Sequence, residues 1–451
     1  MVDILIKNGL VLTMDRERRI IREGAIAIEK NKIVDVGKSS DLVKSVRADK
    51  VIDASGRIVM PGLVCTHCHT HSKVWMGIPT PPATELYSIL STGWWPMLED
   101  QLTKKDVYNI ARFACLEMIT LGTTMVCDVM EAPKGLPGIL DSEANGFREV
   151  GMRGIVCQEA TERISKENGE LGIRENADFA KKWNKDPNAL VKGMLCVHTT
   201  FTCSLEMLKR VRRLADELRC GITLHVEESV YEVDYCKKTY GKPSVPLLNE
   251  IGFLGPDVLA AQCVQTTEEE IKTLAKRGVK VAHNLQTNME TGGGIPRVPQ
   301  MLDAGLTVSV GNDGFIPDMF EVIRGVFMTH KGVTRDVNVL PADKCMDMVT
   351  IEGAKALGME REIGSLEKGK KADLIIMRFP TVTPLIPDSV YYQIMTLARG
   401  ETVETSIIDG RIVMENRKVL TADPEEVMKN CAETSLDIWN RDKVDLEKRL
   451  L

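Results

Sequence analysis

Histidine is scarce in this chain, with seven among 451 residues, and two of them form the pair His67-x-His69. The pair follows a short apolar run that is typical of a β-strand. Because side chains alternate along a strand, both imidazoles are expected to project from the same face. Two imidazoles placed in this way are half of a metal site.

Further residues of ligand type follow two later apolar runs. His225 lies near the end of one run, with Glu228 three residues on, and Asp313 follows another run. The distances along the chain fit four and three βα units of about 30–40 residues. Three imidazoles and a carboxylate suit one divalent cation, Zn²⁺ first and Fe²⁺ second. The predicted ligands are His67, His69, His225 and Asp313.

Other interpretations of these residues exist. An isolated His-x-His pair is also found in ordinary packed cores. Cys65 and Cys68 form a C-x-x-C motif that would suit redox chemistry or zinc. That motif has no second copy and lies on a buried strand rather than at a thioredoxin-like turn, so it is disfavoured.

A metal site of this kind needs a scaffold that gathers strand ends. Eight short apolar runs occur between residues 58 and 310, most of them followed by a helical pattern, and two helices are expected to begin at Thr103 and Thr267. This alternation predicts an α/β fold, a (β/α)₈ TIM barrel over residues 58–362, whose active site lies at the carboxyl ends of the strands. A doubly wound open sheet is the alternative, but no GxGxxG or P-loop pattern supports it. The runs are Ile58–Val64, Thr124–Cys127, Gly154–Cys157, Gly193–Val197, Ile222–Val226, Val258–Val264, Val279–Ala282 and Thr307–Val310.

Both ends of the chain have a different sequence pattern from the middle, with short alternating strands and turns such as Asn8-Gly9 and Asp409-Gly410. We expect residues 1–57 and 363–422 to form one small β-sandwich domain together. Residues 423–451 are expected to form a C-terminal helix, which packs on the barrel or on a second subunit.

Composition limits the classes of function. The chain has 58 Lys and Arg against 64 Asp and Glu, a net charge of −6, and no basic block, which argues against a nucleic-acid or membrane-surface partner. No apolar stretch is long enough to span a membrane, and the first residues lack a secretory signal. Twelve cysteines in a chain of this length predict reduced thiols and a cytoplasmic location.

Seven segments carry a more specific pattern. They are VMPGLVCTHCH at 59–69, Gly122-Thr123-Thr124, His198 with FTCS at 201–204, HVEE at 225–228, HNLQTNM at 283–289, GNDG at 311–314 and IGSLEKGKKADL at 363–374. In this order they resemble the signatures of the amidohydrolase superfamily. The branch most similar holds methylthioadenosine/S-adenosylhomocysteine, guanine and cytosine deaminases and triazine hydrolases, and the closest resemblance is to SsnA-type aminohydrolases.

The resemblance implies a metal-dependent hydrolase of carbon–nitrogen bonds other than peptide bonds. Its expected reaction is hydrolytic deamination of a nitrogen heterocycle, a cyclic amidine, by metal-bound hydroxide. Asp313 would take a proton from the water, and Glu228 would protonate a ring nitrogen before ammonia leaves. A homodimer is expected because dimers are common in the family.

One position departs from the family pattern. The run at 260–265 matches AHCVH, but Gln262 stands where the family has the histidine that helps to activate the water. An amide can hold a water molecule but cannot exchange a proton near pH 7. Either Gln262 only orients water, or the reaction is ring opening or displacement of a leaving group, or the protein binds without turnover.

The substrate is expected to contact residues near the predicted metal. His198 and His283 lie at expected strand ends, and His71 follows the ligand strand. Trp94 and Trp95 lie in the long loop after the first barrel strand, where an aromatic wall suits a flat heterocycle. His330 matches no motif and is predicted to be a surface or packing residue.

Overall fold

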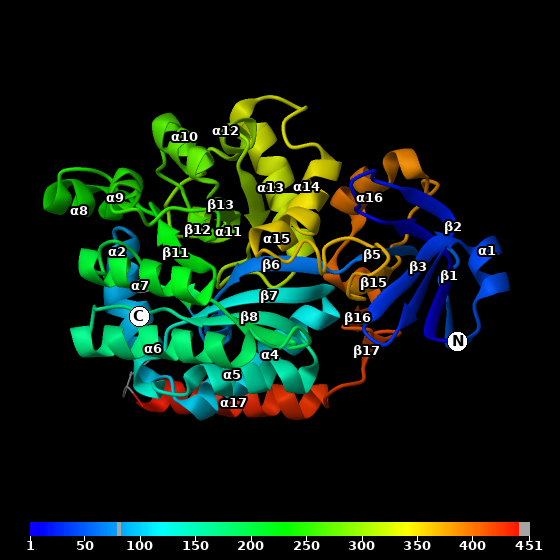
Figure 1. The fold of residues 1–451 in the computed structure, drawn as a ribbon, viewed down its shortest axis with the longest axis horizontal. Coiled ribbons are helices and arrows are strands. Elements are labelled where there is room, and N and C mark those ends of the chain that lie inside the picture. The colour runs from blue at the N-terminus through cyan, green and yellow to red at the C-terminus, as the bar shows by residue number, and fades with distance from the viewer. Residues whose placement is uncertain (79–82, 442–451) are drawn as a thin grey trace.

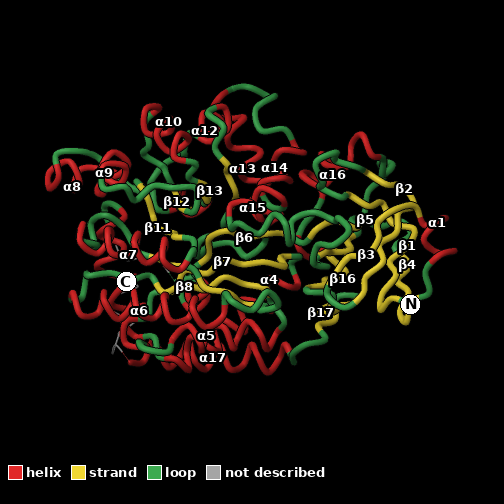
Figure 2. Tube along the Cα trace, in the orientation of Figure 1, coloured by secondary structure: helices red, strands yellow, loops and turns green. Residues whose placement is uncertain are grey.

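The computed structural model describes residues 1–78 and 83–441 and has two parts of unequal size (Figure 1). The larger part is a ring of parallel strands with helices outside it, and the smaller part is a sheet beside the ring. Figure 2 shows this as a group of strands enclosed by helices on one side and a sheet at the other.

The barrel strands form two hydrogen-bonded arcs, β6-β7-β8-β9 and β10-β11-β12-β13-β14. The fourth strand is interrupted between β9 and β10, and a backbone bridge from Cys68 to Asp313 joins β6 to the end of β14. The predicted (β/α)₈ barrel is therefore confirmed. Its strands are β6 (Leu63–Cys68), β7 (Thr123–Met130), β8 (Arg153–Gln158), β9 (Val191–Gly193), β10 (Leu195–Cys196), β11 (Ile222–Val226), β12 (Val258–Gln262), β13 (Lys280–His283) and β14 (Thr307–Val310).

Helices cover the outside of the ring, and local sequence signals begin several of them. Thr103 and Thr267 each form a capping box with an acidic residue three positions later, as predicted. The outer helices are α4 (Lys104–Thr120), α5 (Ile139–Val150), α6 (Lys166–Trp183), α7 (Leu205–Leu218), α8 (Val230–Tyr240), α9 (Ser244–Glu250), α10 (Glu268–Arg277), α11 (Leu285–Glu290), α12 (Val298–Asp303), α13 (Met319–Thr334), α14 (Ala342–Met348), α15 (Ile351–Ala356) and α16 (Val390–Leu397).

The loop after β6 forms a series of short helical turns over the carboxyl ends of the strands. These are η1 (Thr70–Val74), α2 (Leu86–Ile89), η2 (Leu90–Trp94), α3 (Trp95–Met97) and η3 (Glu99–Gln101). Trp94 and Trp95 lie at the junction of η2 and α3, so both indole rings belong to this covering loop.

The terminal segments form one continuous nine-stranded sheet, in which β5 lies between β1 and β15. The small β domain is thus made from both ends of the chain. Its elements are β1 (Val2–Leu12), β2 (Ile20–Glu29), β3 (Lys32–Lys38), α1 (Ser39–Ser45), β4 (Ala48–Asp53), β5 (Ile58–Pro61), β15 (Leu374–Met377), β16 (Val403–Ile408), β17 (Arg411–Glu415) and β18 (Lys418–Val419).

The apolar run Ile58–Val64, expected to be one strand, is divided at Gly62. The first half is β5 of the terminal sheet, and the second half begins β6 of the barrel. A Cβ atom at Gly62 would lie 2.1 Å from the side chain of Thr124, so the crossing requires glycine. Hydrophobicity alone does not mark this break.

The last described helix, α17 (Pro424–Arg441), packs on the barrel, which is one of the two alternatives expected for it (Figure 1). Residues 442–451, expected to belong to the same helix, lie outside the described residues. Asn109 of α4 donates a side-chain hydrogen bond to Thr434 of α17, at 3.0 Å. The indole nitrogen of Trp439 donates to the carbonyl oxygen of Val74 in η1, also at 3.0 Å.

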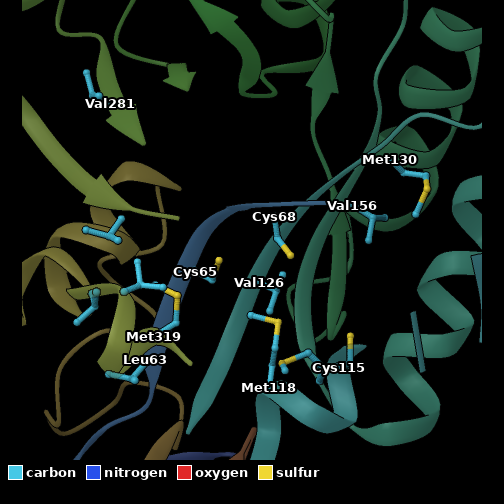
Figure 3. Packing of buried hydrophobic residues seen from close by; sticks show 14 of the residues in the cluster. Leu63, Cys65, Cys68, Cys115, Met118, Val126, Met130, Val156, Val281 and Met319 are labelled. Carbon is cyan, nitrogen blue, oxygen red and sulfur yellow. The ribbon is translucent and has the colours of Figure 1, made fainter. Parts of the chain in front are cut away.

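The main hydrophobic core lies between the strands and the outer helices. Figure 3 shows Cys115 and Met118 of α4 near Val126 of β7. All twelve cysteines are buried and unpaired, in agreement with the prediction of free thiols. Among the described residues, no helix is long and apolar enough to cross a membrane.

Candidate active site

The four predicted metal ligands converge at the carboxyl ends of three strands. His67 lies in β6, His69 directly after it, His225 in β11 and Asp313 after β14. One ligand atom from each lies within 4.8 Å of the others, and all four side chains are buried. The carboxylate of Asp313 lies 3.6 Å from His67 Nε2 and 3.7 Å from His69 Nε2.

The backbone holds Asp313 in this place. Its φ of +56° lies in the left-handed region, which few residues other than glycine adopt. Its N–H donates to the carbonyl of His67, and its own carbonyl accepts from the N–H of His69, each at 3.0 Å. The two strand ends are therefore fixed to each other by main-chain hydrogen bonds.

The polar atoms of this group fit a cation. Both ring nitrogens of His67 are buried without a hydrogen-bond partner, which is costly unless another group completes them. His69 Nδ1 lies 2.7 Å from the carbonyl oxygen of Val129 and donates to it, so its Nε2 carries the free lone pair. Burial holds the pKa of His67 well below its usual value, which keeps it in the neutral form that metals bind.

A carboxylate that the sequence analysis missed lies behind one of the ligands. Glu159, directly after β8, has Oε1 2.9 Å from His225 Nδ1, and both side chains are buried. Burial lowers the pKa of His225, but the opposing effect of the Glu159 charge is larger, and the pKa is raised to about 10. A carboxylate on the far nitrogen of a ligand histidine fixes the orientation of its ring.

A cavity of about 450 Å³ opens in front of this group. Glu228 lines it together with His69, His225 and Asp313. Burial raises the pKa of Glu228 to about 8, and the charge of Asp313 acts in the same direction. A carboxylic acid that keeps its proton near neutral pH can act as a general acid toward a molecule in the cavity.

Gln262 contacts a predicted ligand instead of the cavity. Its Nε2 donates to Asp313 Oδ2 at 2.5 Å, and it is not among the residues that line the cavity. The φ of +76° at Gln262 turns the chain at the end of β12 toward Asp313. The amide therefore restrains the carboxylate, on the atom that also faces His67.

Three of the five predicted substrate-binding residues line the cavity, namely His198, Trp94 and Trp95. His198 is held by a 2.8 Å contact between its Nδ1 and the hydroxyl of Thr202. His71 is buried beside the cavity rather than lining it, with Nε2 3.2 Å from Glu99 Oε1. His71 thus contacts the carboxylate of Glu99, to which Trp94 also donates its indole N–H.

His283 lies outside the cavity lining. Its Nε2 is 3.1 Å from Nε2 of His330, and both rings are buried between β13 and α13. Ala282 belongs to the cluster of residues inside the barrel, so the next side chain along β13 points outward to the helices. His330 is a packing residue, as one of the two expectations for it stated, and is only 1% exposed.

A second buried charged cluster lies next to the cavity, and no sequence motif marks it. Arg163 approaches Glu131 at 2.5 Å, Asp100 at 2.7 Å and Glu99 at 3.6 Å. Its guanidinium carbon also lies 4.9 Å from the centre of the Trp95 ring. We call Arg163, Glu99, Asp100 and Glu131 the Arg163 network.

Together the barrel, the three-histidine and one-aspartate group, and the acid in the same cavity define a metal-dependent hydrolase. The sequence profile of the Amidohydrolase family matches residues 58–413, so the chain belongs to the amidohydrolase family. It is a hydrolase that acts on carbon–nitrogen bonds other than peptide bonds and uses a divalent metal ion.

Relatives of known name match along almost the whole chain. A 5′-deoxyadenosine deaminase of Methanosarcina barkeri is 37% identical, over 98% of this chain and 99% of that protein. A 5-methylthioadenosine/S-adenosylhomocysteine deaminase of Moorella thermoacetica is 36% identical, over 94% of this chain and 97% of that protein.

Solved structures show the same fold. An adenosine deaminase from Xanthomonas campestris with bound zinc has a TM-score of 0.89 and 25% identity, covering 97% of this chain and 98% of that one. Atrazine chlorohydrolase from Arthrobacter aurescens, complexed with zinc, has a TM-score of 0.86 and 22% identity, covering 96% of this chain and 100% of that one, and this likeness is one of fold alone.

Proposed function

We propose that the protein is a zinc-dependent deaminase of an amino-substituted heterocycle of the purine nucleoside type. The observation that carries the proposal is the presence of Glu228 in the same cavity as the four-ligand group. The names of the relatives, which are deaminases of adenosine derivatives, support the choice of reaction and of substrate.

The ion would be held by His67, His69, His225 and Asp313. When bound there, it would lower the pKa of a water molecule enough to make it a nucleophile near neutral pH.

The protein groups then move protons. Asp313 takes a proton from the water, and Glu228 donates one to the ring nitrogen next to the amino-bearing carbon. The oxygen of the water adds to that carbon. Asp313 passes its proton to the amino nitrogen, the carbon–nitrogen bond breaks, and ammonia leaves. The hydroxyl group on the ring carbon returns a proton to Glu228 and becomes the ring carbonyl.

Gln262 has no proton to exchange, and its hydrogen bond to Asp313 gives it a restraining role. In this proposal it orients Asp313, so ring opening or displacement of a leaving group is not needed to explain its presence. Gln262→His should shift the pH profile of kcat/KM, because it places a titratable group on Asp313. An unchanged pH profile of kcat/KM would contradict the proposal that Gln262 orients Asp313.

The test is ammonia release by the zinc-loaded protein across adenosine derivatives, guanine, cytosine, pterins and cyclic ureides. We expect turnover of adenosine derivatives and a loss of 10²–10⁴-fold in kcat/KM for Glu228→Gln, about the effect of a general acid. Glu290→Gln, an exposed carboxylate of the same cavity, is the control and should lose far less. One bound zinc ion per chain with no ammonia from any compound would indicate a binding protein.

We further infer that the protein is a cytoplasmic homodimer. It binds a small heterocyclic substrate and neither nucleic acid nor a membrane. The absence of a basic block supports the exclusion of nucleic acid, and the buried free cysteines support the cytoplasmic location. Light scattering after gel filtration would test the dimer.

A further inference from the structure

A buried acid of the second barrel strand holds the turn that follows the ligand His69. Asp128 of β7 and Thr70, the first residue of η1, are both fully buried. One carboxylate oxygen of Asp128 accepts the backbone N–H of Thr70 at 2.8 Å, and the other accepts the hydroxyl of Thr70. Both oxygens of Asp128 are thus used by one residue, and they fix the peptide that joins His69 to Thr70.

The same strand also holds the ring of His69. Val129, next to Asp128, accepts the ring N–H of His69 through its main-chain oxygen, at 2.7 Å. Thr70 is also where the covering loop begins, and Trp94 of that loop lines the cavity. A displacement of Asp128 would therefore release both a metal ligand and the wall of the cavity.

A second acid lies behind Asp128. Glu143 of α5 is fully buried, and its carboxyl group faces that of Asp128. Neither oxygen of Glu143 has a hydrogen-bond partner of ordinary length among the described residues. Burial raises the pKa of Glu143 well above its usual value, and the charge of Asp128 acts in the same direction. Two buried carboxyl groups that face each other are not both ionised, so this pair holds one proton.

A proton, and not a counter-ion, neutralises Glu143. Arg112 of α4, the helix that packs beside α5, is paired with Glu149 and Glu426 instead. The ionisable groups that face Glu143 from the neighbouring elements are thiols and carboxyls, and none carries positive charge. They are Asp128 and Cys127 on β7, Cys115 on α4, Cys157 on β8 and Glu175 on α6.

We propose that Asp128 and Glu143 form an acid pair that positions His69 and the start of the covering loop, with Glu143 holding the proton that the pair shares. The protonated carboxyl keeps Asp128 turned to Thr70. Both acids are positioning residues, because they act through Thr70 and neither of them lines the cavity. The proposal rests on the metal site of the proposed function, and it is independent of which heterocycle reacts.

Zinc affinity of the metal-free protein, measured by competition with a chelator, tests the positioning role. Asp128→Asn should weaken binding about tenfold, because an amide oxygen accepts from only one of the two donors of Thr70. Glu143→Leu should weaken it by about the same factor. Glu143→Gln keeps a donor toward Asp128 and should bind within about threefold of the parent protein, a rescue that a residue with only a space-filling role would not show.

The matched control is Glu175 of α6, another buried acid that accepts main-chain N–H groups. Its oxygens lie 2.7 Å from the nitrogen of Gly138 and 2.9 Å from that of Leu140, outside the metal site. Glu175→Gln should lower Tm and leave zinc affinity unchanged. If Asp128→Asn does not fold, Thr70→Val removes only the hydroxyl donor and should weaken zinc binding about threefold.

The shared proton is tested by Tm against pH in the metal-free protein. The folded chain keeps a proton on Glu143 that the unfolded chain loses near pH 4.5, so this group makes the protein less stable as pH rises above that value. Glu143→Gln has no such proton to lose, so its Tm relative to the parent protein should rise with pH. Parallel curves would overturn the assignment of the proton to Glu143.

The zinc measurements also separate this proposal from the deaminase function. Parental zinc affinity in both Asp128→Asn and Glu143→Leu would overturn the positioning role, and so would an equal loss in Glu175→Gln. Weaker zinc binding in the first two variants alone, with no ammonia released from any compound by the zinc-loaded parent protein, would refute deamination and leave the acid pair standing.

Discussion

Two buried groups of ionisable side chains lie next to each other in this protein, and only one of them contains a permanent cation. The metal group, defined as His67, His69, His225 and Asp313, has a carboxylate that faces imidazoles, the amide of Gln262 and the N–H of Gly314. The Arg163 network has three carboxylates around a guanidinium.

The difference teaches how to tell a metal site from a structural cluster. Three carboxylates of Glu99, Glu131 and Glu159 also lie close enough together to hold an ion. Arg163 already supplies positive charge to two of them, so they need none from outside. The metal group contains no arginine or lysine, and both buried ring nitrogens of His67 have no hydrogen-bond partner.

The largest effect should come from removing a ligand. His67→Ala is expected to leave less than about one tenth of the bound zinc and to reduce kcat/KM on the order of 10³-fold, since the metal supplies the nucleophile. Metal content after dialysis and ammonia release measure the two effects. His330→Asn, at a buried histidine outside the group, should keep its zinc, and loss of zinc from both variants would make the comparison meaningless.

The next effect concerns the cation of the Arg163 network. Arg163→Met should lower the free energy of unfolding by about 3–5 kcal/mol, because it leaves buried carboxylates unpaired. Urea unfolding measures this change. Arg174→Met breaks an exposed pair with Glu170 and should cost less than about 1 kcal/mol. Equal losses in the two variants would show that Arg163 does not neutralise its neighbours.

A smaller effect is expected at Glu159, which lies between the two groups. Glu159→Ala should weaken zinc binding about 10–100-fold by releasing the ring of His225, and Glu159→Gln should weaken it less because its oxygen can still accept from Nδ1. Competition with a chelator gives the affinity. Unchanged zinc affinity in both variants would show that Glu159 does not orient the ring of His225 for metal binding.

The smallest effect is a change in pH dependence. Burial raises the pKa of Glu99 to about 8 from 4.5, so below pH 8 the folded protein holds a proton that the unfolded chain has lost. This group therefore makes the protein less stable as pH rises from about 4.5 to 8. Glu99→Gln should remove that decline, so its Tm relative to the parent protein should rise over this range. Asp100→Asn, the more exposed partner of Arg163, is the control, and parallel curves for Glu99→Gln and the parent would refute the effect.

Much of the scaffold was predictable because its signals are periodic and local. The alternation of apolar runs and helical patterns predicted the barrel, and capping residues such as Thr103 and Thr267 predicted helix starts. The division at Gly62 was not predictable, since it depends on the distant side chain of Thr124.

The site residues were predictable only where their spacing in the sequence is itself a recognisable pattern. The pair His67 and His69 has a strand period, whereas Glu159 and Arg163 are single charged residues whose partners lie on other strands or loops. A position at a strand end also does not fix the direction of the side chain. His283 points outward to His330 for this reason, although its neighbours in sequence form part of a matched motif.

The hydrogen bond from Trp439 to Val74 joins positions 365 residues apart, and the ring of Trp439 also lies 5.3 Å from that of Trp75. Trp75 in turn lies 5.9 Å from Trp94, so three indole rings lead from α17 to the cavity wall. During synthesis the barrel strands emerge long before Trp439 does. Trp439 itself does not line the cavity, so helix α17 supports the aromatic wall from behind, and the wall gains this support only after α17 has been synthesised.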